Sequence, residues 1–214
     1  MTEGSTHGAM SPGGAGRGVL KRLLSPLITV RGPRGFLYLT FDDGPVPDYT
    51  PQLLEVLEAY SVKATFFMVG ALIERRPDLA VQVVAKGHTA GYHSFLHRHV
   101  RHLSIKEAVR DLETIRNVPG WRGAPMRHYR PPYGELSVVR LLWCLINRIG
   151  VSMWSLDSGD STALTADELV LRLSPESVRD GDVILFHDDS KVTVEALPRI
   201  LQNLRKAGYS FAAL

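Results

Sequence analysis

Two adjacent carboxylates, Asp42 and Asp43, follow the apolar run 36–41 and precede the dipeptide Gly44-Pro45. Successive side chains of a strand point to opposite faces, so the two acids leave the strand in different directions, and Gly-Pro turns the chain after them. Two acids at the end of a strand can divide catalytic work, because one can bind a metal ion while the other moves protons. The alternative interpretation is a polar turn after a buried strand.

Two histidines, His93 and His97, are the first partners for these acids. If a helical turn begins at His93, His97 lies about 40° around the helix axis one turn later, on the same face. That spacing suits two imidazoles on one metal ion, and His99 and His102 do not share the face. A His-x3-His pair is more often part of a solvated surface. With Asp43 as a third ligand, however, the pair becomes a two-histidine, one-carboxylate site, which suits a catalytic divalent metal.

Polar residues also follow three later apolar runs. Arg130 lies in the segment 129–134, YRPPYG, whose paired prolines fix the backbone. This segment is either a rigid turn or a device that aims Arg130 at a carboxylate and points a backbone N–H into the site. Asp157 and Asp160 follow the next run, and His187 ends the one after it. A histidine in that position is often a hydrogen-bonded core residue, but beside a metal site, with an acid from the neighbouring strand, it is a candidate general acid.

The elements that must position these residues alternate between strand and helix patterns. The expected strands cover residues 36–41, 64–69, 88–92, 127–130, 151–156, 183–187 and 209–213, and the expected helices cover residues 50–59, 77–86, 104–117, 136–148, 165–173 and 192–206. Ser104 and Glu107 form a capping box, and Thr50 precedes Pro51 as a helix N-cap. This alternation predicts right-handed βαβ units and a parallel sheet, either closed as a barrel or open and doubly wound. In both architectures the functional residues lie at the C-terminal ends of the strands.

The composition is that of an ordinary soluble fold, with 44% hydrophobic and 22% charged residues among 214. Residues 1–35 hold five of the 25 Lys and Arg and one of the 22 acids, so the rest of the chain is near neutral, which argues against nucleic-acid binding. The single cysteine, Cys144, lies in an apolar helical pattern and is expected in the core. No apolar run approaches the roughly 18 residues of a membrane span, and residues 1–18 do not resemble a signal peptide, so we expect a cytoplasmic protein with no transmembrane segment.

The N-terminal residues divide into two parts ahead of one domain over residues 36–214. Residues 1–18 are rich in glycine and serine and are expected to form a disordered tail. Residues 19–35 are expected to form a short helix and a linker, because apolar residues recur there at helical spacing beside two cations: Leu20, Leu23, Leu24, Leu27 and Ile28 with Lys21 and Arg22. We favour a helix that closes the bottom of the domain, since the segment is short for a membrane anchor; the alternative is peripheral contact of residues 19–30 with an anionic membrane.

The order of these motifs resembles the polysaccharide deacetylases, the NodB-homology domain of carbohydrate esterase family 4. The resemblance covers about residues 36–214 and touches all five motifs of that family. The signature T-F-D-D matches residues 40–43, H-[ST]-x-x-H matches 93–97, and R-P-P-Y-G matches 130–134. The aspartate-rich fourth motif falls on 157–160, and the strand that ends in histidine falls on 185–187. The first two motifs together are highly specific, and the last three support them.

The resemblance implies a distorted (β/α) barrel, here of about seven parallel strands in a single domain, that removes acetyl groups from N-acetylated sugars. By similarity, Asp43, His93 and His97 would hold one divalent metal ion, which we expect to be zinc, with cobalt or another divalent ion as the alternative. Asp42 would be the general base and His187 the general acid. Arg130 would orient Asp42, and an aspartate of the fourth motif, Asp160 or Asp157, would orient His187. The expected substrate contacts are Tyr133, Trp154 and Leu185.

One residue departs from the family pattern. The fourth motif usually reads D-x-x-D-W, whereas Ser161 follows Asp160 here. Either another aromatic residue such as Trp154 fills the place of the missing indole, or the acyl pocket is wider. The rival functions are an O-acetyl esterase with the same machinery and a non-catalytic sugar-binding barrel. The second rival would be expected to lack Asp42, a metal ligand or His187, and all of these are present.

Overall fold

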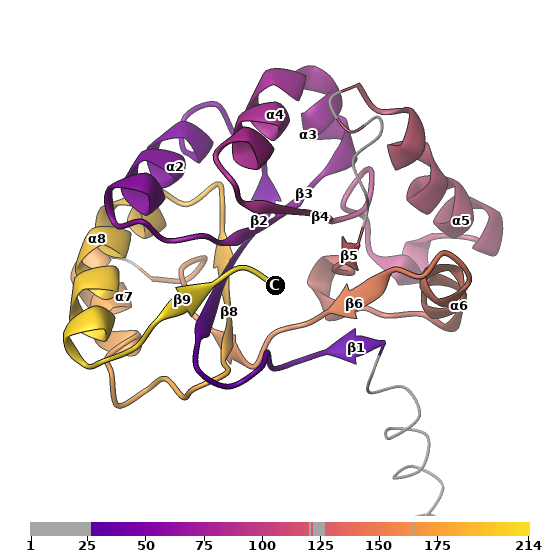
Figure 1. The fold of residues 1–214 in the computed structure, drawn as a ribbon. Helices are drawn as coiled ribbons and strands as arrows, with labels where there is room; N and C mark the ends of the chain where they lie inside the picture. Colours follow the sequence, from indigo (N-terminus) through magenta and orange to yellow (C-terminus); the bar gives the residue numbers. More distant parts are fainter. Residues whose placement is uncertain (1–26, 120, 122–126, 164) are drawn as a thin grey trace, which may run out of the picture.

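The computed structural model describes residues 27–119, 121, 127–163 and 165–214. Within them, parallel strands curl into an open barrel with helices on its outer surface (Figure 1). The strands are β1 (Ile28–Thr29), β2 (Leu37–Gly44), β3 (Thr65–Met68), β4 (Thr89–Tyr92), β5 (His128–Tyr129), β6 (Gly150–Ser152), β7 (Leu156–Asp157), β8 (Val183–His187) and β9 (Phe211–Ala212). The helices are α2 (Thr50–Ala59), α3 (Gly70–Arg75), α4 (Pro77–Ala85), α5 (Ile105–Thr114), α6 (Val138–Ile146), α7 (Ala166–Arg172) and α8 (Lys191–Lys206). The expected (β/α) barrel of parallel strands is confirmed.

Strand β2 lies at the centre of the sheet, whose order is β1-β6-β5-β4-β3-β2-β8-β7. It pairs in parallel with β3 on one side and with β8 on the other. Phe41 stacks on Phe66 and on Phe186, with ring centroids 4.9 and 5.4 Å away, so the apolar run continues into the core on both neighbouring strands. Because its residues up to Asp42 are almost completely buried, β2 gives the acids at its end a fixed starting point.

The predicted strand 151–156 is wrong, because the chain leaves the sheet after β6 and re-enters it as β7. These two strands lie near opposite ends of the strand order, and among the described residues β1 and β7 are not paired with each other. The connection crosses this opening: Met153 N–H donates to Thr29 O (2.7 Å) and Ser155 N–H donates to Val183 O (3.0 Å). Trp154 therefore lies where the barrel is open, between a bond to β1 and a bond to β8.

The last residues of the chain close the other end of the barrel. β9 pairs with the first two residues of β2, and Figure 1 shows the C-terminus inside the ring of strands and helices. Leu214 N–H donates to Thr65 Oγ1 (3.0 Å), and Thr89 Oγ1 donates to Leu214 O (3.3 Å), so the terminus is tied to the starts of β3 and β4. The expected closing strand is present, although it is two residues long and half-buried.

Two expected helix starts have different outcomes. The capping box at Ser104 and Glu107 is confirmed by hydrogen bonds in both directions. The cap at Thr50 is wrong, because Thr50 is already helical and its hydroxyl instead accepts from Val46 N–H (2.7 Å) and donates to the buried Asp188 carboxylate. That hydroxyl holds the turn after Gly44 against the end of β8.

The predicted helix at residues 19–28 lies mostly outside the described residues, as does the tail 1–18. Its last residue is not helical, since Ile28 belongs to β1 and pairs with Val151 of β6. No helix that the structure describes is long and apolar enough to cross a membrane.

Candidate metal and catalytic site

The ends of β2, β4, β5 and β8 meet at one rim of the barrel. Asp42 is in register with His187, and Tyr92, directly before His93, is in register with Tyr129, directly before Arg130. Because the strands are parallel, their C-terminal ends bring together side chains that lie up to 145 residues apart in sequence.

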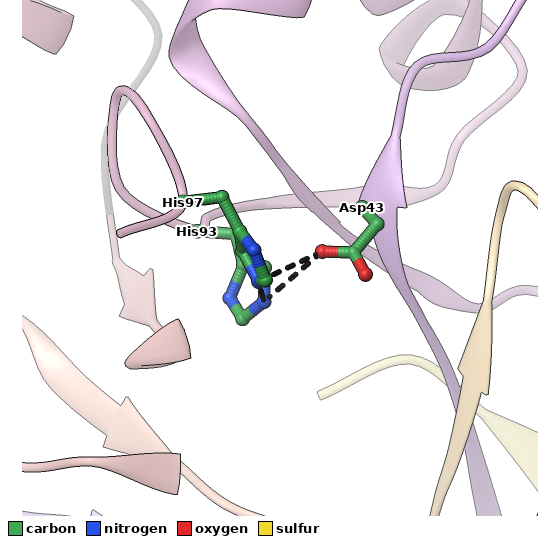
Figure 2. A group of neighbouring side chains, drawn as sticks. All are labelled: Asp43, His93 and His97. Carbon is green, nitrogen blue, oxygen red and sulfur yellow. Dashed lines mark hydrogen bonds and ion pairs between the residues drawn. The ribbon is translucent and has the colours of Figure 1, made fainter. Parts of the chain in front are cut away.

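Asp43, His93 and His97 form a compact group of three possible metal ligands (Figure 2). Asp43 Oδ1 lies 3.0 Å from His97 Nε2 and 3.4 Å from His93 Nε2. The two Nε2 atoms are 3.2 Å apart. The three atoms thus converge on one point, with the carboxylate from the end of β2 and both imidazoles from the loop after β4.

The predicted helical turn at 93–97 is wrong, because this segment is a loop in which Ser94 and His97 have positive φ angles of 67° and 51°. Contacts from distant residues hold the loop. The buried Asp111 carboxylate accepts hydrogen bonds from the backbone N–H groups of Phe95 (3.0 Å) and Leu96 (3.3 Å). The backbone N–H of His97 donates to Ser94 Oγ (2.9 Å). The histidines therefore meet through a tied loop rather than through helical spacing.

The environment of the three ligands fits a divalent cation. His93 Nδ1 lies 2.8 Å from the carbonyl oxygen of Arg130, so its proton donates there and the Nε2 lone pair faces Asp43 and His97. Burial lowers the pKa of His93 to about 3, which keeps this imidazole neutral. Asp43 Oδ1 is buried and accepts no hydrogen bond. Lone pairs that face one another without a proton between them are satisfied by a cation, and two imidazoles with one carboxylate suit zinc and similar metals.

Asp42 lies beside this group and is held by Arg130. Arg130 Nη1 donates to Asp42 Oδ1 (2.7 Å) and to Thr40 Oγ1 (2.8 Å). The rest of this fully buried guanidinium donates to the carbonyls of Ser152 (3.0 Å) and Met153 (2.8 Å) and lies over the ring of Phe67. A guanidinium fixed by this many bonds can orient Asp42 with little freedom.

Arg130 lowers the pKa of Asp42, but it does not bring that pKa below its ordinary value. Burial raises that pKa more than the Arg130 charge and hydrogen bond lower it. His93 Nε2 lies 3.6 Å from Asp42 Oδ2, so a divalent cation among the three ligands would stand close to Asp42 and favour its ionised form.

His187 and Asp160 form a second tightly bonded pair. His187 Nδ1 donates to Asp160 Oδ1 (2.7 Å), and its backbone N–H donates to Asp160 Oδ2 (2.7 Å). Burial disfavours the charged imidazole, but the hydrogen bond and charge of Asp160, together with the charges of Asp42 and Asp43, outweigh burial and raise the pKa of His187 to about 9. Asp157 takes no part in this pair; it is exposed and accepts from Gly159 N–H. Of the two aspartates, Asp160 is therefore the one that is bonded to His187.

These groups line a cleft of about 320 Å³. All the expected site residues line the cleft except Arg130 and Asp160, which lie behind Asp42 and His187. The complete lining is Asp42, Asp43, His93, His97, Pro131, Tyr133, Trp154, Asp157, Ser161, Leu185 and His187. Trp154 and Ser161 thus border the same space, so an indole does face the cleft although the fourth motif lacks one. A larger hollow of about 630 Å³ lies along α5, but its lining includes neither histidine nor aspartate.

Several supporting residues carried no signal in the sequence. Thr193, in the first turn of α8, donates to Asp160 Oδ2 (2.6 Å) and helps to keep the pKa of Asp160 below its ordinary value despite burial. His99 stacks on Tyr133 with centroids 3.6 Å apart and lies 3.1 Å from Glu135 Oε1 through Nδ1. These roles depend on contacts between distant segments, which residue spacing does not encode.

Comparison with known proteins agrees with this geometry. The family model described as polysaccharide deacetylase matches residues 29–154. A peptidoglycan-N-acetylglucosamine deacetylase from Bacillus cereus is 34% identical over 191 residues, covering 82% of this chain and 84% of the relative. A chitooligosaccharide deacetylase from Sinorhizobium fredii is 34% identical over 193 residues, covering 83% and 89%.

Among solved structures, a CE4 family pseudoenzyme from Bacillus anthracis has a TM-score of 0.81 at 26% identity, covering 89% of this chain and 68% of that one. The same fold therefore occurs in a relative that is described as a pseudoenzyme. From the family model and the two sequence relatives, the chain belongs to the polysaccharide deacetylase family.

Proposed function

We propose that this protein is a metal-dependent hydrolase that removes acetyl groups from N-acetylated sugars of a polysaccharide or oligosaccharide. The observation that carries the proposal is one cleft lined by the Asp43–His93–His97 group, by Asp42, which is bonded to Arg130, and by His187, which is bonded to Asp160. The two relatives named as deacetylases support the reaction class.

Asp43, His93 and His97 would hold the divalent ion, which we propose to be zinc, with cobalt or another divalent ion as the alternative. Bound there, such an ion would supply Lewis acidity to the acetyl carbonyl and would lower the pKa of water to about 7. The contribution of the chain is to fix the three ligand atoms: the Arg130 carbonyl holds the His93 ring, and the tied loop holds His97.

Asp42 would act as the general base that accepts a proton from the attacking water. Its Oδ1 is bound by Arg130, so Oδ2 is the oxygen free to face the reacting centre. Arg130 makes no contact with the cleft and acts as a positioning residue, whose bonds to two backbone carbonyls leave Asp42 one orientation.

His187 would act as the general acid that protonates the leaving nitrogen. With a pKa of about 9 its imidazolium is the main form at neutral pH, so the proton that the departing amine needs is already in place. Its Nδ1 is bound to Asp160, which leaves Nε2 as the donor. A backbone N–H near Tyr133 would help to stabilise the negative charge that develops on the acetyl oxygen.

Tyr133, Trp154 and Leu185 would contact the sugar. All three line the cleft, and Tyr133 is 53% exposed, so a sugar could reach this side chain. Because the relatives act on peptidoglycan N-acetylglucosamine and on chitooligosaccharides, we propose a substrate that contains N-acetylglucosamine.

The test is acetate release by the purified full chain from N-acetylated chitooligosaccharides and from peptidoglycan, before and after chelation and after addition of zinc or cobalt. We expect metal-dependent release that Asp42→Asn lowers by about 10²–10⁴-fold. Parallel assays on an O-acetylated oligosaccharide distinguish the esterase alternative, which would release acetate from the ester and not from the amide. Sugar binding without acetate release from either substrate, in metal-loaded protein, would instead identify a non-catalytic barrel.

A further inference from the structure

One backbone N–H of the segment 131–136 has no acceptor among the described residues. Pro131 and Pro132 have no N–H to donate. The N–H groups of the three residues 134–136 donate to the carbonyl oxygens of Pro131 (3.1 Å), Pro132 (3.0 Å) and Gly134 (3.0 Å). The N–H without an acceptor in the part of the chain that the structure describes is that of Tyr133, which lines the cleft. The donor that the proposed function needs near Tyr133 is therefore the N–H of Tyr133 itself.

The backbone of Tyr133 has a conformation that its side chain disfavours. The φ angle is 56°, in the left-handed region that residues other than glycine rarely adopt. Such a conformation persists only where the surrounding contacts hold it, and it recurs at sites where the backbone itself takes part in function. The direction of the Tyr133 N–H therefore depends on what holds Tyr133.

The contacts that hold Tyr133 come from the loop after β4. The ring of His99 stacks on the ring of Tyr133, with centroids 3.6 Å apart and an angle of 13° between the planes. The Tyr133 hydroxyl donates to the His97 carbonyl oxygen at 3.4 Å, and the His97 imidazole lies tilted, 4.7 Å from the same ring. The hydroxyl bond is long, so the stack with His99 is the tighter of these contacts.

His99 is fixed in turn by Glu135, two residues after Tyr133. Glu135 Oε1 lies 3.1 Å from His99 Nδ1, and Glu135 Oε2 accepts a hydrogen bond from the N–H of Val100 (2.9 Å). The two carboxylate oxygens thus hold the His99 ring and the backbone beside it. A ring that is both stacked and hydrogen-bonded has little freedom to rotate, so His99 can fix the ring that packs on it.

We propose that His99 is a positioning residue for the reaction: its stack on Tyr133 keeps the Tyr133 backbone left-handed, with the N–H directed at the charge that develops on the acetyl oxygen. The inference rests on the proposed function, because this N–H has a task only if that charge forms. His99 neither lines the cleft nor belongs to the group of three metal ligands, so it acts through Tyr133. A residue that merely supported the loop of His97 would instead be needed for metal binding.

The test compares acetate release by metal-saturated wild type with that of His99→Ala, His99→Gln and His99→Phe. Loss of an oxyanion donor costs about 10²–10³-fold in kcat, so the two variants without a ring should lower kcat by at least about tenfold. KM should change by less than about twofold, since the N–H acts on the transition state, and metal content should stay equal. His99→Phe keeps a flat ring for the stack and should retain kcat within about threefold of the wild type. His102→Ala is the matched control, because His102 is an exposed histidine of the same loop that meets His99 edge-on and, among the described residues, has no contact with Tyr133.

A second measurement follows Tyr133 without relying on turnover. In protein labelled with ¹⁵N-tyrosine, the Tyr133 amide signal is identified by its loss in Tyr133→Phe. The coupling between its amide and Hα protons reports the φ angle. We expect this coupling to change in His99→Ala and to keep its wild-type value in His99→Phe and in His102→Ala.

The positioning role is overturned if His99→Ala keeps the wild-type kcat, if it loses metal in proportion to activity, or if His102→Ala loses as much activity. It is also overturned if the Tyr133 coupling stays unchanged in His99→Ala. Where His99→Ala does not fold, equal kcat values in His99→Gln and His99→Phe overturn it. If the wild type releases no acetate from any substrate, the proposed function fails instead, and the coupling still shows whether His99 holds Tyr133.

Discussion

Replacing Asp160 by asparagine should move the alkaline limit of activity to lower pH. The Asp160 carboxylate accepts the Nδ1 proton of His187 at 2.7 Å and is the largest favourable influence on the charged imidazole. Asparagine keeps the size of the side chain but removes its charge, so burial then opposes the charged form with less compensation. Activity that needs the imidazolium is lost as pH rises through the pKa of His187, which should fall in the variant.

The magnitude follows from the difference between a pKa of about 9 and the ordinary value of 6.5, that is, about 2.5 pH units. At pH 8 about nine tenths of the wild-type His187 is protonated, against about 3% in a variant with a pKa near 6.5, so kcat/KM should fall about 30-fold from this cause alone. Near pH 5.5 both proteins carry the proton, and the protonation difference should almost vanish.

The measurement is the pH profile of kcat/KM for acetate release by metal-saturated protein, from about pH 5.5 to about pH 10. An NMR titration of the His187 imidazole gives the same pKa without relying on turnover. Asp157→Asn is the matched control, because Asp157 lies in the same motif and lines the cleft but makes no contact with His187. In Asp157→Asn, kcat/KM should decline at the same alkaline pH as in the wild type.

An alkaline limb that stays in place in Asp160→Asn would refute the reasoning, as would an equal shift in Asp157→Asn. A uniform loss of activity at all pH values, with the His187 titration unchanged, would mean that Asp160 supports the structure of the site but not the protonation of His187.

Three further predictions concern other parts of the chain. Asp42→Asn should keep its metal and lose about 10²–10⁴-fold in turnover, whereas Asp43→Asn should lose metal by elemental analysis; the opposite metal contents would mean that the two roles are exchanged. Gly44→Ala should lower the free energy of unfolding in urea by about 1–3 kcal/mol, because a Cβ there would lie 1.9 Å from Asp188 Oδ2; an unchanged midpoint would contradict the close packing. Truncation after Lys206 should cause loss of thermal stability or aggregation, because it removes β9 and the bonds from Leu214 to Thr65 and Thr89; a soluble truncated protein with native melting behaviour would show that this closure is dispensable.

The strand and helix patterns were enough to predict a parallel sheet and the rim on which the candidate groups lie, whereas the barrel was implied only by the resemblance to the family. Strand and helix patterns are local, and parallel strands must present their C-terminal ends on one side, so the ends at Asp42, Tyr92, Tyr129 and His187 could be assigned to one rim without coordinates. The adjacent acids and the His-x3-His spacing then indicated a site that binds a metal ion beside a residue that transfers protons.

The tertiary structure decided how these residues meet. His93 and His97 converge through a loop with positive φ angles, held by Asp111 from α5, and not through a helical turn. It also decided that Asp160 and not Asp157 binds His187, and that the chain crosses the opening of the barrel at 153–155.

The physical reason is the range of the forces involved. Periodicity and turn residues act on the backbone over a few neighbouring residues. They therefore predict most of the helices and strands where the backbone is regular. Loop conformation and pKa depend on partners brought in by folding: the bond from His93 to the Arg130 carbonyl, the buried guanidinium at Asp42, and Thr193 at Asp160 join segments 33 to 88 residues apart. Burial itself, which raises the pKa of Asp42 against the Arg130 charge, exists only once the chain has folded.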